Sequence, residues 1–544
     1  MLYSPPSMTI ASPAPAALNS YDQVPYLNRA HARTHPDRLA ALATLLGLDP
    51  PCLDRCRVLE LGCANGRNLL PIASLLPGAE FVGVDLSARQ ITDGQAGVAE
   101  LGLKNLVLRH ANLADVDAAY GAFDYIICHG VYSWVDAPTQ DKILAICRAN
   151  LTPAGVAYVS FNSLPGWHDK LRVREMLLHE VDHIADPQVR IRKAREFLNL
   201  IAGLVAPKDQ PASTAYGSLL RAEAELVNGQ DNDYIFHEYL EQHNTPIYFY
   251  EFARRAAEHD LQYLADADLG LRSLDRLPAE VLDAMRQHAD GIVAQEQLLD
   301  YYTNRTFHSS LLVPAGLRVD RSVTTARLRR LHFRSPLQPV AAMPDITGAT
   351  YETFAAADLD STFATAHPAT KAAMVVLREA YPRAVPFDDL IAAACARVYP
   401  GGDLANSKVM LTREAETVGL NLLQGHMHDN QLIDVHSFAP HLAVHPGPLP
   451  AALPSARFEA LHGHNVTNAY HRPVGLGTLS WYLLPFLDGT RDLDALVELV
   501  MANQTLAVEK AGEELSDPAV KRPLLRAQVA SSLDGLARAA LLLA

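Results

Sequence analysis

The sequence lacks an excess of positive charge. Its 46 lysine and arginine residues are outnumbered by 61 aspartate and glutamate residues, which gives a formal net charge of −15 at pH 7. Binding to a nucleic-acid backbone or to an anionic membrane surface needs a basic face. The arginine-rich stretch at residues 172–197 alternates charges of both signs, as a solvated helix face does. The composition therefore predicts no general binding of nucleic acid.

Cysteine is also scarce, with six residues scattered over a chain of 544. This distribution forms no disulfide framework and predicts a protein of the reducing cytoplasm. Cys52 and Cys56 lack the two-residue spacing of a zinc knuckle, so we interpret them as free thiols. Histidines gather in residues 424–445, but none of them stands in an H-E-x-x-H frame, and we predict no metal site there.

Long apolar runs are missing as well. No stretch reaches about 18 uninterrupted apolar residues, so we expect no membrane insertion. The first 20 residues have no basic start followed by an apolar run, so we do not expect a signal peptide. Their proline, alanine and serine content predicts a disordered tail. The length of 544 residues is too great for one core and predicts about three or four domains.

Apolar segments alternate with helical ones over about the first 200 residues. Strands are predicted over residues 57–61, 80–86, 105–113, 123–130 and 156–162, and helices over 68–76, after the cap at Ser87, and over 139–151. A turn at residues 152–155 is expected to end the last of these helices. Strands separated by helices imply right-handed crossovers and a mostly parallel sheet. Ligands of such sheets bind at the carboxyl ends of the strands, where the loops below are expected to lie.

The segment VLELGCANGRN, residues 58–68, places a glycine turn between the first strand and the first helix of this unit. A dinucleotide and S-adenosylmethionine compete as its ligand. Ala64 stands between Gly62 and Gly66, so the G-x-G-x-x-G spacing of a dinucleotide site fails. Glu60 would repel a pyrophosphate but suits a ligand that carries an ammonium and a sulfonium group. The residues favour S-adenosylmethionine, and a tight turn without a ligand is the alternative.

Polar residues follow the next two strands. Asp85 ends the second strand, where a carboxylate can accept hydrogen bonds from both ribose hydroxyls. Asn112 follows the third strand, where an amide oxygen can accept a hydrogen bond from the adenine amino group. We predict cofactor contacts from residues at these strand ends and ahead of the sheet: Tyr21, Tyr26, Glu60, Gly62, Cys63, Ala64, Asn65, Gly66, Asp85, Leu86, Gln90, Asn112, Leu113, His129 and Gly130.

Several longer stretches resemble one family. They include YDQVPY (21–26), FVGVDLSARQI (81–91), FDYIICHGVYSWV (123–135), VAYVSFNSLPGWH (156–168) and DYIFHEYLEQHNTPIYFYEFARRAAEHDLQYLADADL (233–269). These stretches resemble class I S-adenosylmethionine-dependent methyltransferases that carry a methyltransferase regulatory domain, a group that includes bacterial protein-lysine methyltransferases. The resemblance is dense over about residues 21–312 and thinner afterwards. Ala64, Asn65, Arg67 and Asn112 depart from the residues usual in that group.

The resemblance implies an α/β fold with a Rossmann-like class I methyltransferase core, followed by a helical regulatory domain and C-terminal winged-helix-like and helical domains. The boundaries we predict are a disordered tail over residues 1–20, a methyltransferase domain over 21–205, a regulatory domain over 206–315, a linker over 316–365, a winged-helix-like domain over 366–445 and a helical domain over 446–544.

Methyl transfer from a sulfonium needs alignment of the acceptor more than acid catalysis, and an amine acceptor must be neutral. Aromatic faces can surround such a cation and exclude water. The loops after the fourth and fifth strands supply the side chains that we predict to be catalytic: His129, Tyr132, Trp134, Asn162 and Trp167. Packing at the end of the sheet is the alternative for Tyr132 and Trp134, and fixing a turn is the alternative for Asn162.

The leading hypothesis is an enzyme that transfers methyl groups from S-adenosylmethionine to a protein side chain, with lysine implied by the resemblance. The large non-catalytic portion favours a protein substrate, although such appendages also serve a homodimer. Two alternatives stay open: a methyltransferase for a small molecule, and a regulatory or scaffold protein that binds the cofactor without transferring a methyl group.

Overall fold

The structure, a computed structural model, describes residues 20–24, 29–207, 214–268, 277–357, 359–400, 408–429, 431–503, 509–510, 513–514 and 518–544. The chain forms two compact units. Of the described residues, those within Met1–Leu27, Ser87–Gln90 and Arg172–Gln242 form the smaller unit, and those within Asn28–Leu86, Ile91–Leu171 and His243–Ala544 form the larger unit.

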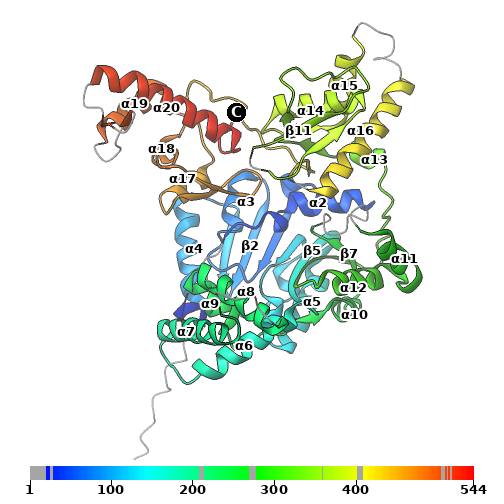
Figure 1. Cartoon of the computed structure of the whole chain (residues 1–544), viewed down its shortest axis with the longest axis vertical. Coiled ribbons are helices and arrows are strands. Elements are labelled where there is room, and N and C mark those ends of the chain that lie inside the picture. Colours follow the sequence, from blue (N-terminus) through cyan, green and yellow to red (C-terminus); the bar gives the residue numbers. More distant parts are fainter. Residues whose placement is uncertain are drawn as a thin grey trace, which may run out of the picture. The chain divides into compact units, whose positions relative to one another are not determined.

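The larger unit contains, in its described residues, a sheet of eight strands (Figure 1). The strand order is β3-β2-β1-β4-β5-β8-β7, and β6 pairs with β5. The strands β1 to β6 pair in parallel, whereas β8 runs antiparallel to both β5 and β7. The bounds are β1 Arg57–Leu61, β2 Glu80–Asp85, β3 Leu106–His110, β4 Phe123–Cys128, β5 Leu151–Leu164, β6 Ile247–Tyr248, β7 Leu261–Asp266 and β8 Phe307–Pro314. The mostly parallel sheet predicted from the alternation is confirmed.

One predicted boundary in this sheet differs from the structure. The turn expected at residues 152–155 belongs to β5, which begins at Leu151 instead of residue 156. Leu151 pairs with Phe123, and the register then shifts before Tyr125 pairs with Val156. An irregularity of this kind adds residues to one strand without ending the pairing, so a turn-like sequence lies inside a strand.

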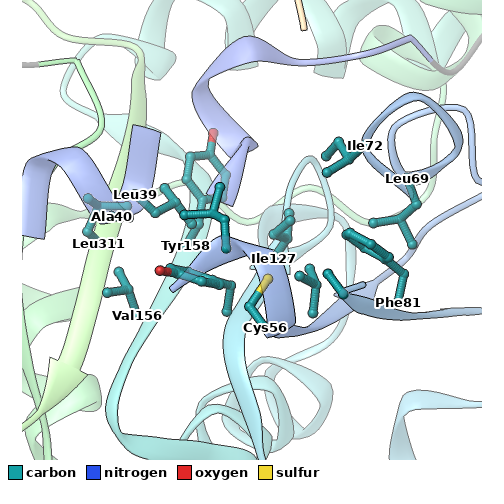
Figure 2. Packing of buried hydrophobic residues seen from close by; sticks show 14 of the residues in the cluster. Leu39, Ala40, Cys56, Leu69, Ile72, Phe81, Ile127, Val156, Tyr158 and Leu311 are labelled. Atoms are coloured by element: carbon teal, nitrogen blue, oxygen red, sulfur yellow. The ribbon is translucent and has the colours of Figure 1, made fainter. Parts of the chain in front are cut away.

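Both faces of the sheet are buried. Alternate residues of β1 point to opposite sides, so that Val58 packs with α2 and α3 while Leu59 packs with α5 and α10. Figure 2 shows the first of these cores, in which Leu39 of α2 and Leu69 of α3 approach Phe81 and Tyr158 of the sheet. The helices are α2 Pro36–Leu45, α3 Leu69–Leu75, α4 Ala88–Glu100, α5 Ala137–Asn150 and α10 Phe249–Glu258. Strands buried on both faces read as continuous apolar runs.

Three strands of the sheet come from the segment that was expected to be a separate helical domain. The strands β6, β7 and β8 lie within residues 206–315, together with α11 Ala279–His288 and α12 Gly291–Thr303. These strands were not predicted, because a fully buried strand such as β8 lacks the alternation that separates a strand from a buried helix. The regulatory segment therefore completes the methyltransferase sheet.

The smaller unit is helical. Its core contains Leu177, Leu198, Leu220 and Tyr239, each from a different helix. The helices are α1 Ser20–Gln23, α6 Trp167–Val181 from Arg172 onward, α7 Pro187–Val205, α8 Ala215–Gly229 and α9 Asn232–Tyr239. Because α7 packs with α8 in one core, this unit continues across residue 205, where the sequence analysis ends the methyltransferase domain.

The C-terminal part of the larger unit has two further cores. The first contains α13 Thr325–Leu328, α14 Pro368–Ala380, α15 Phe387–Val398 and α16 Lys408–His428, with the sheets β13-β9-β14 and β10-β11-β12. The second contains α17 Pro454–Ala460, α18 Thr478–Leu483, α19 Leu493–Ala502, α20 Pro518–Arg538 and the pair β15-β16. The short strands are β9 His332–Arg334, β10 Gln338–Pro339, β11 Glu352–Ala355, β12 Phe363–Thr365, β13 Val385–Pro386, β14 Asp434–His436, β15 Asn465–Thr467, β16 Pro473–Gly475, β17 Glu509–Lys510 and β18 Glu513–Glu514. In the part of the chain that the structure describes, no helix has the length and apolarity needed to cross a membrane.

Helix α2 belongs to two cores at once. Its Leu39 and Leu42 face the methyltransferase sheet, whereas Ala41 and Leu45 pack in the core of α14, α15 and α16. Its second residue, Asp37, is buried and accepts four hydrogen bonds from the segment that follows Val435. The helix thus joins the methyltransferase core to the C-terminal part.

The Asp37 carboxylate is neutralised by a histidine. His436 Nδ1 lies 2.6 Å from Asp37 Oδ2, and His436 Nε2 lies 3.3 Å from Asp434 Oδ2. Burial alone would lower the pKa of His436, but the carboxylates of Asp434 and Asp37 raise it above its usual value. Since the folded pKa is raised, this histidine stabilises the fold fully below its unfolded pKa of about 6.5. That contribution is lost as the pH rises through the folded pKa.

We expect Asp37→Ala to destabilise the full chain by about 3 kcal/mol, because it leaves the buried His436 with one carboxylate fewer and removes the acceptor of two backbone N–H groups. Thermal unfolding followed by circular dichroism measures the change in apparent melting temperature. The control is Asp49→Ala, which removes an exposed partner of Arg330 and should change stability by less than about 1 kcal/mol. Equal melting temperatures for the two variants would show that the Asp37 contacts do not join the two parts.

Candidate functional site

The glycine turn after β1 has three residues in the left-handed backbone region. Gly62 has φ +75°, Gly66 has φ +71° and Ala64 has φ +50°. A Cβ atom on Gly62 would collide with Val131, and one on Gly66 would lie 2.9 Å from Leu108 Cδ1. Both glycines are therefore required by conformation and by close packing. Ala64 takes the same conformation at a cost of about 1 kcal/mol.

Asp85 holds this turn in place. The parallel pairing of β1 with β2 brings the ends of both strands together, and Asp85 Oδ2 accepts a hydrogen bond of 2.8 Å from the Ala64 N–H. The backbone amide of Ala64 is thus hydrogen-bonded to Asp85, the carboxylate predicted to bind the ribose. Two of the predicted cofactor residues are brought into direct contact.

Glu60 lies beneath the turn and is 4% exposed. Its Oε1 accepts a hydrogen bond of 2.8 Å from Asn68 Nδ2. Among the described residues, no donor reaches its buried Oε2. Burial raises the pKa of Glu60 to about 8; the hydrogen bond from Asn68 opposes this shift and the charge of Asp85 adds to it. A buried carboxylate oxygen without a donor fits a ligand that brings its own positive group.

Asn68 is the centre of a polar network that sequence reasoning missed. Its Oδ1 accepts from the backbone N–H of His31 at 3.0 Å and lies 2.8 Å from His471 Nε2. Its Nδ2 donates to Thr34 Oγ1 at 3.0 Å as well as to Glu60. Asn68 ends the quoted glycine segment, so its proximity to Glu60 was visible, but nothing near it in the sequence points to His471.

The histidines around the turn are held neutral. Burial, followed by the charges of Arg29 and Arg33, lowers the pKa of His31 to about 4. The pKa values of His129 and His471 are lowered well below the usual range, again chiefly by burial. The rings of His31 and His129 lie 4.1 Å apart between centroids. Neutral imidazoles beside Glu60 leave room for an incoming cation without repelling it.

His129 follows β4 and is held by a chain of hydrogen bonds. Its Nδ1 lies 3.0 Å from the Tyr158 hydroxyl, and that hydroxyl donates to Ser309 Oγ at 3.0 Å. Ser160 Oγ lies 3.2 Å from the same His129 nitrogen, so two hydroxyls hold the ring in place. Ser160 Oγ accepts the N–H of Gly130 and fixes the backbone next to the ring.

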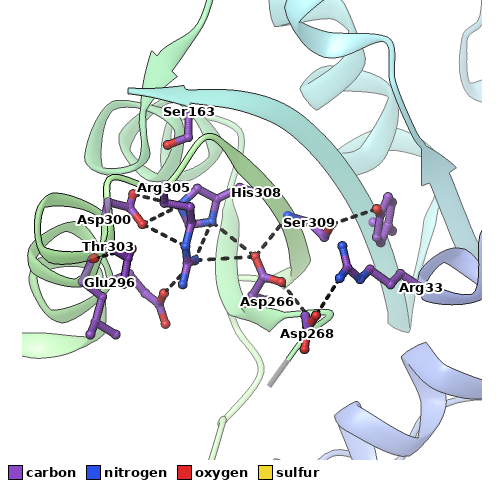
Figure 3. A network of polar contacts seen from close by, with 12 residues as sticks. Arg33, Ser163, Asp266, Asp268, Glu296, Asp300, Thr303, Arg305, His308 and Ser309 are labelled. Atoms are coloured by element: carbon purple, nitrogen blue, oxygen red, sulfur yellow. Dashed lines mark hydrogen bonds and ion pairs between the residues drawn. The ribbon is translucent and has the colours of Figure 1, made fainter. Parts of the chain in front are cut away.

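The chain of hydrogen bonds from His129 ends in a buried cluster of charged residues in the regulatory segment (Figure 3). Asp266 Oδ2 accepts the Ser309 N–H at 3.0 Å and lies 3.3 Å from His308 Nδ1. The cluster alternates acids with cations: Arg305 contacts Asp266, Glu296 and Asp300, and His308 contacts Asp266 and Asp300. The regulatory segment therefore sets the position of Tyr158 and, through it, the orientation of His129.

The loops after β4 and β5 meet at the same edge of the sheet. The Ser133 hydroxyl accepts the Asn162 N–H at 2.8 Å, which fixes the end of β5 against the loop after β4. The rings of Trp134 and Trp167 lie 6.1 Å apart, edge to face, and Lys170 Nζ lies 5.0 Å from the Trp167 ring. The structure thus brings Trp134, Asn162 and Trp167 together at one edge of the sheet, and their catalytic role stays a prediction.

Tyr132 lies elsewhere than its predicted catalytic role requires. It is fully buried, with its ring 5.4 Å from Phe252 and 6.1 Å from Phe161 between centroids. Burial, opposed by the charge of Arg255, raises the pKa of its hydroxyl to about 12. The structure supports the packing alternative, because no face of this ring is open to an acceptor.

The other predicted cofactor residues fall into three groups. Cys63, Leu86, Asn65, Leu113 and Gly130 lie in the larger unit at the strand ends, and Asn112 uses its Oδ1 to accept the Ala114 N–H at 2.9 Å. Tyr21 and Gln90 belong to the smaller unit, where Tyr21 stacks on His237 at 4.5 Å and Gln90 donates its N–H to Ser87 Oγ. Tyr26 lies outside the described residues.

Comparison with family models assigns three segments. A "Methyltransferase domain" model matches residues 59–157, a "Predicted methyltransferase regulatory domain" model matches 231–314, and a "PKMT, C-terminal winged helix domain" model matches 449–541. The first match contains the glycine turn and the second contains the buried charge cluster. The third falls on the segment for which the sequence predicts a helical domain.

Similar proteins extend over nearly the whole chain. An uncharacterized protein of Rickettsia prowazekii is 34% identical over 514 residues, which is 92% of this chain and 88% of that protein. PKMT2 from Rickettsia typhi has a solved structure with a TM-score of 0.83 and 28% identity, covering 96% of this chain and 100% of that one. Its complex with AdoHcy matches with the same TM-score and 29% identity.

We expect the affinity for S-adenosylhomocysteine to rise by up to about tenfold per pH unit between about pH 6 and pH 8, because an ammonium group is attracted only to the ionised form of Glu60. Isothermal titration calorimetry over this pH range measures the change. In Glu60→Gln, which has no titrating group, the affinity should be lower at pH 8 and nearly independent of pH. A flat profile for the wild-type chain would exclude Glu60 as the ammonium partner.

Proposed function

Because this chain belongs to the class I S-adenosylmethionine-dependent methyltransferases that carry a methyltransferase regulatory domain, we propose that it methylates lysine side chains of a protein. The observation that carries the choice of acceptor is the similarity to PKMT2, a protein-lysine methyltransferase, over 96% of the chain, including the C-terminal segment. A small-molecule methyltransferase would share only the sheet. S-Adenosylmethionine supplies an electrophilic methyl group on its sulfonium.

We assign the cofactor contacts from the geometry of the turn. Asp85 would hold the ribose, Glu60 would face the ammonium group, and the backbone from Gly62 to Gly66 would pass beside the amino-acid end. The neutral His129 lies at the same edge and does not repel a sulfonium. These assignments use only groups that the fold already holds in position, so little reorganisation accompanies binding.

The acceptor side of the site is aromatic. Trp134 is partly exposed, and it packs against the buried Trp167. An indole face attracts an ammonium group and shields a neutral amine from water, so both forms of a lysine side chain can be held there.

We also propose that the enzyme acts in the cytoplasm and forms a homodimer. All six cysteines are free thiols, five of them buried, which suits the reducing cytoplasm. A homodimer is the assembly that we expect for the appended C-terminal segments, and light scattering after size-exclusion chromatography measures the mass.

We expect the purified chain, incubated with methyl-labelled S-adenosylmethionine and a bacterial cell-envelope fraction, to label a protein band whose hydrolysate contains methyl-lysine. The matched control is Asp85→Ala, which should weaken cofactor binding by more than about 100-fold, because two charge-assisted hydrogen bonds to the ribose are lost. Label confined to low-mass material would support a small-molecule acceptor. Cofactor binding without any transfer would support a scaffold protein.

We expect Trp134→Ala to lower kcat/KM for the protein acceptor by about tenfold or more while changing the affinity for S-adenosylhomocysteine by less than about twofold. The indole contributes an aromatic face to the acceptor and none to the nucleoside. Trp134→Phe keeps an aromatic ring and should restore most of the loss. Equal rates for the alanine variant and the wild-type chain would return Trp134 to a packing role.

A further inference from the structure

We propose that His471, which reaches the cofactor turn from the C-terminal segment, is a positioning residue for cofactor binding. It holds the Asn68 amide that aims the Glu60 carboxylate at the ammonium group of the cofactor. This inference rests on the proposed function, because it needs the nucleoside to lie over the glycine turn. It assigns to the winged-helix segment a part in cofactor binding that is separate from contact with a protein substrate.

The direction of each hydrogen bond around Asn68 follows from the donors. The His31 backbone N–H can only donate, so the Asn68 atom that it meets at 3.0 Å must be the oxygen. The Asn68 nitrogen therefore faces Glu60 Oε1 and Thr34 Oγ1. Because His471 Nε2 lies 2.8 Å from the same Asn68 oxygen, His471 must carry its proton on Nε2. The donors thereby fix the orientation of the Asn68 amide and the protonated nitrogen of His471.

The loop that contains His471 holds this residue in a buried, left-handed conformation. It lies between β15 and β16, is 1% exposed and has a left-handed backbone with φ +60°. Its backbone N–H donates to the carbonyl of Asn468 in the same loop at 2.9 Å. Its ring centroid lies 5.3 Å from that of His35. A non-glycine residue persists in this conformation only where the surroundings fix it. The C-terminal loop is thus shaped to present the imidazole to Asn68.

The position of Glu60 matters because of what surrounds it. Burial and the charge of Asp85 disfavour the ionised form of Glu60, and the charge of Glu60 in turn raises the pKa of the Cys63 and Cys128 thiols. The hydrogen bond from Asn68 is the contact that favours the ionised form. An Asn68 amide released from His471 could rotate away, and Glu60 would then keep its proton to a higher pH.

Calorimetry with two ligands tests the inference. S-Adenosylhomocysteine carries the ammonium group, whereas 5′-methylthioadenosine has the same nucleoside without the amino-acid end. We expect His471→Ala to weaken binding of the first by about tenfold and of the second by less than about twofold, because only the first meets Glu60. The pH at which the affinity for S-adenosylhomocysteine rises should also move upward, which a general loss of folding would not produce.

The matched control is His462→Ala, the same change at an exposed histidine of the same segment, which should leave both affinities unchanged. Should His471→Ala not fold, His471→Asn tolerates the left-handed backbone and removes the same reach. The positioning role would be overturned if the folded variant lost affinity for both ligands equally or for neither. A wild-type chain that binds neither ligand would instead overturn the proposed function and this assignment with it.

Discussion

The burial of a single carboxylate, that of Glu60, constrains the architecture around the cofactor turn. An acid removed from water is stable only if neighbouring groups hold it or if it stays protonated. Here the amide of Asn68 supplies one hydrogen bond, and the side chains next to it are imidazoles kept neutral by the same burial. The site is therefore short of positive charge by construction, and a cationic ligand completes it.

The regulatory segment is part of the sheet and not an accessory to it. Its strand β8 pairs with both β5 and β7, and its buried acids and cations connect through Ser309 and Tyr158 to His129. A change in this segment would reach His129 through these hydrogen bonds. The regulatory segment thereby influences the orientation of the His129 imidazole.

The sequence was most informative where chemistry depends on neighbours along the chain. The strand bounds of β1, the turn and the approach of Asp85 to Ala64 follow from local pattern and from parallel pairing. It was least informative where contacts join distant segments. No local signal connects His471 with Asn68, which lie 403 positions apart, or reveals that Tyr132 turns into the core. Buried strands such as β8 were missed for a second reason, since burial on both faces erases alternation.

Helix α2 has a consequence for how this protein can change over evolution. Two faces of this short helix pack in two different cores, and its Asp37 accepts hydrogen bonds from the segment that begins at His436. Deleting the C-terminal half would expose Ala41 and Leu45 to water and remove the His436 partner of Asp37. A shortened descendant would need polar residues in place of Ala41 and Leu45 on one side of α2 before it could lose the rest.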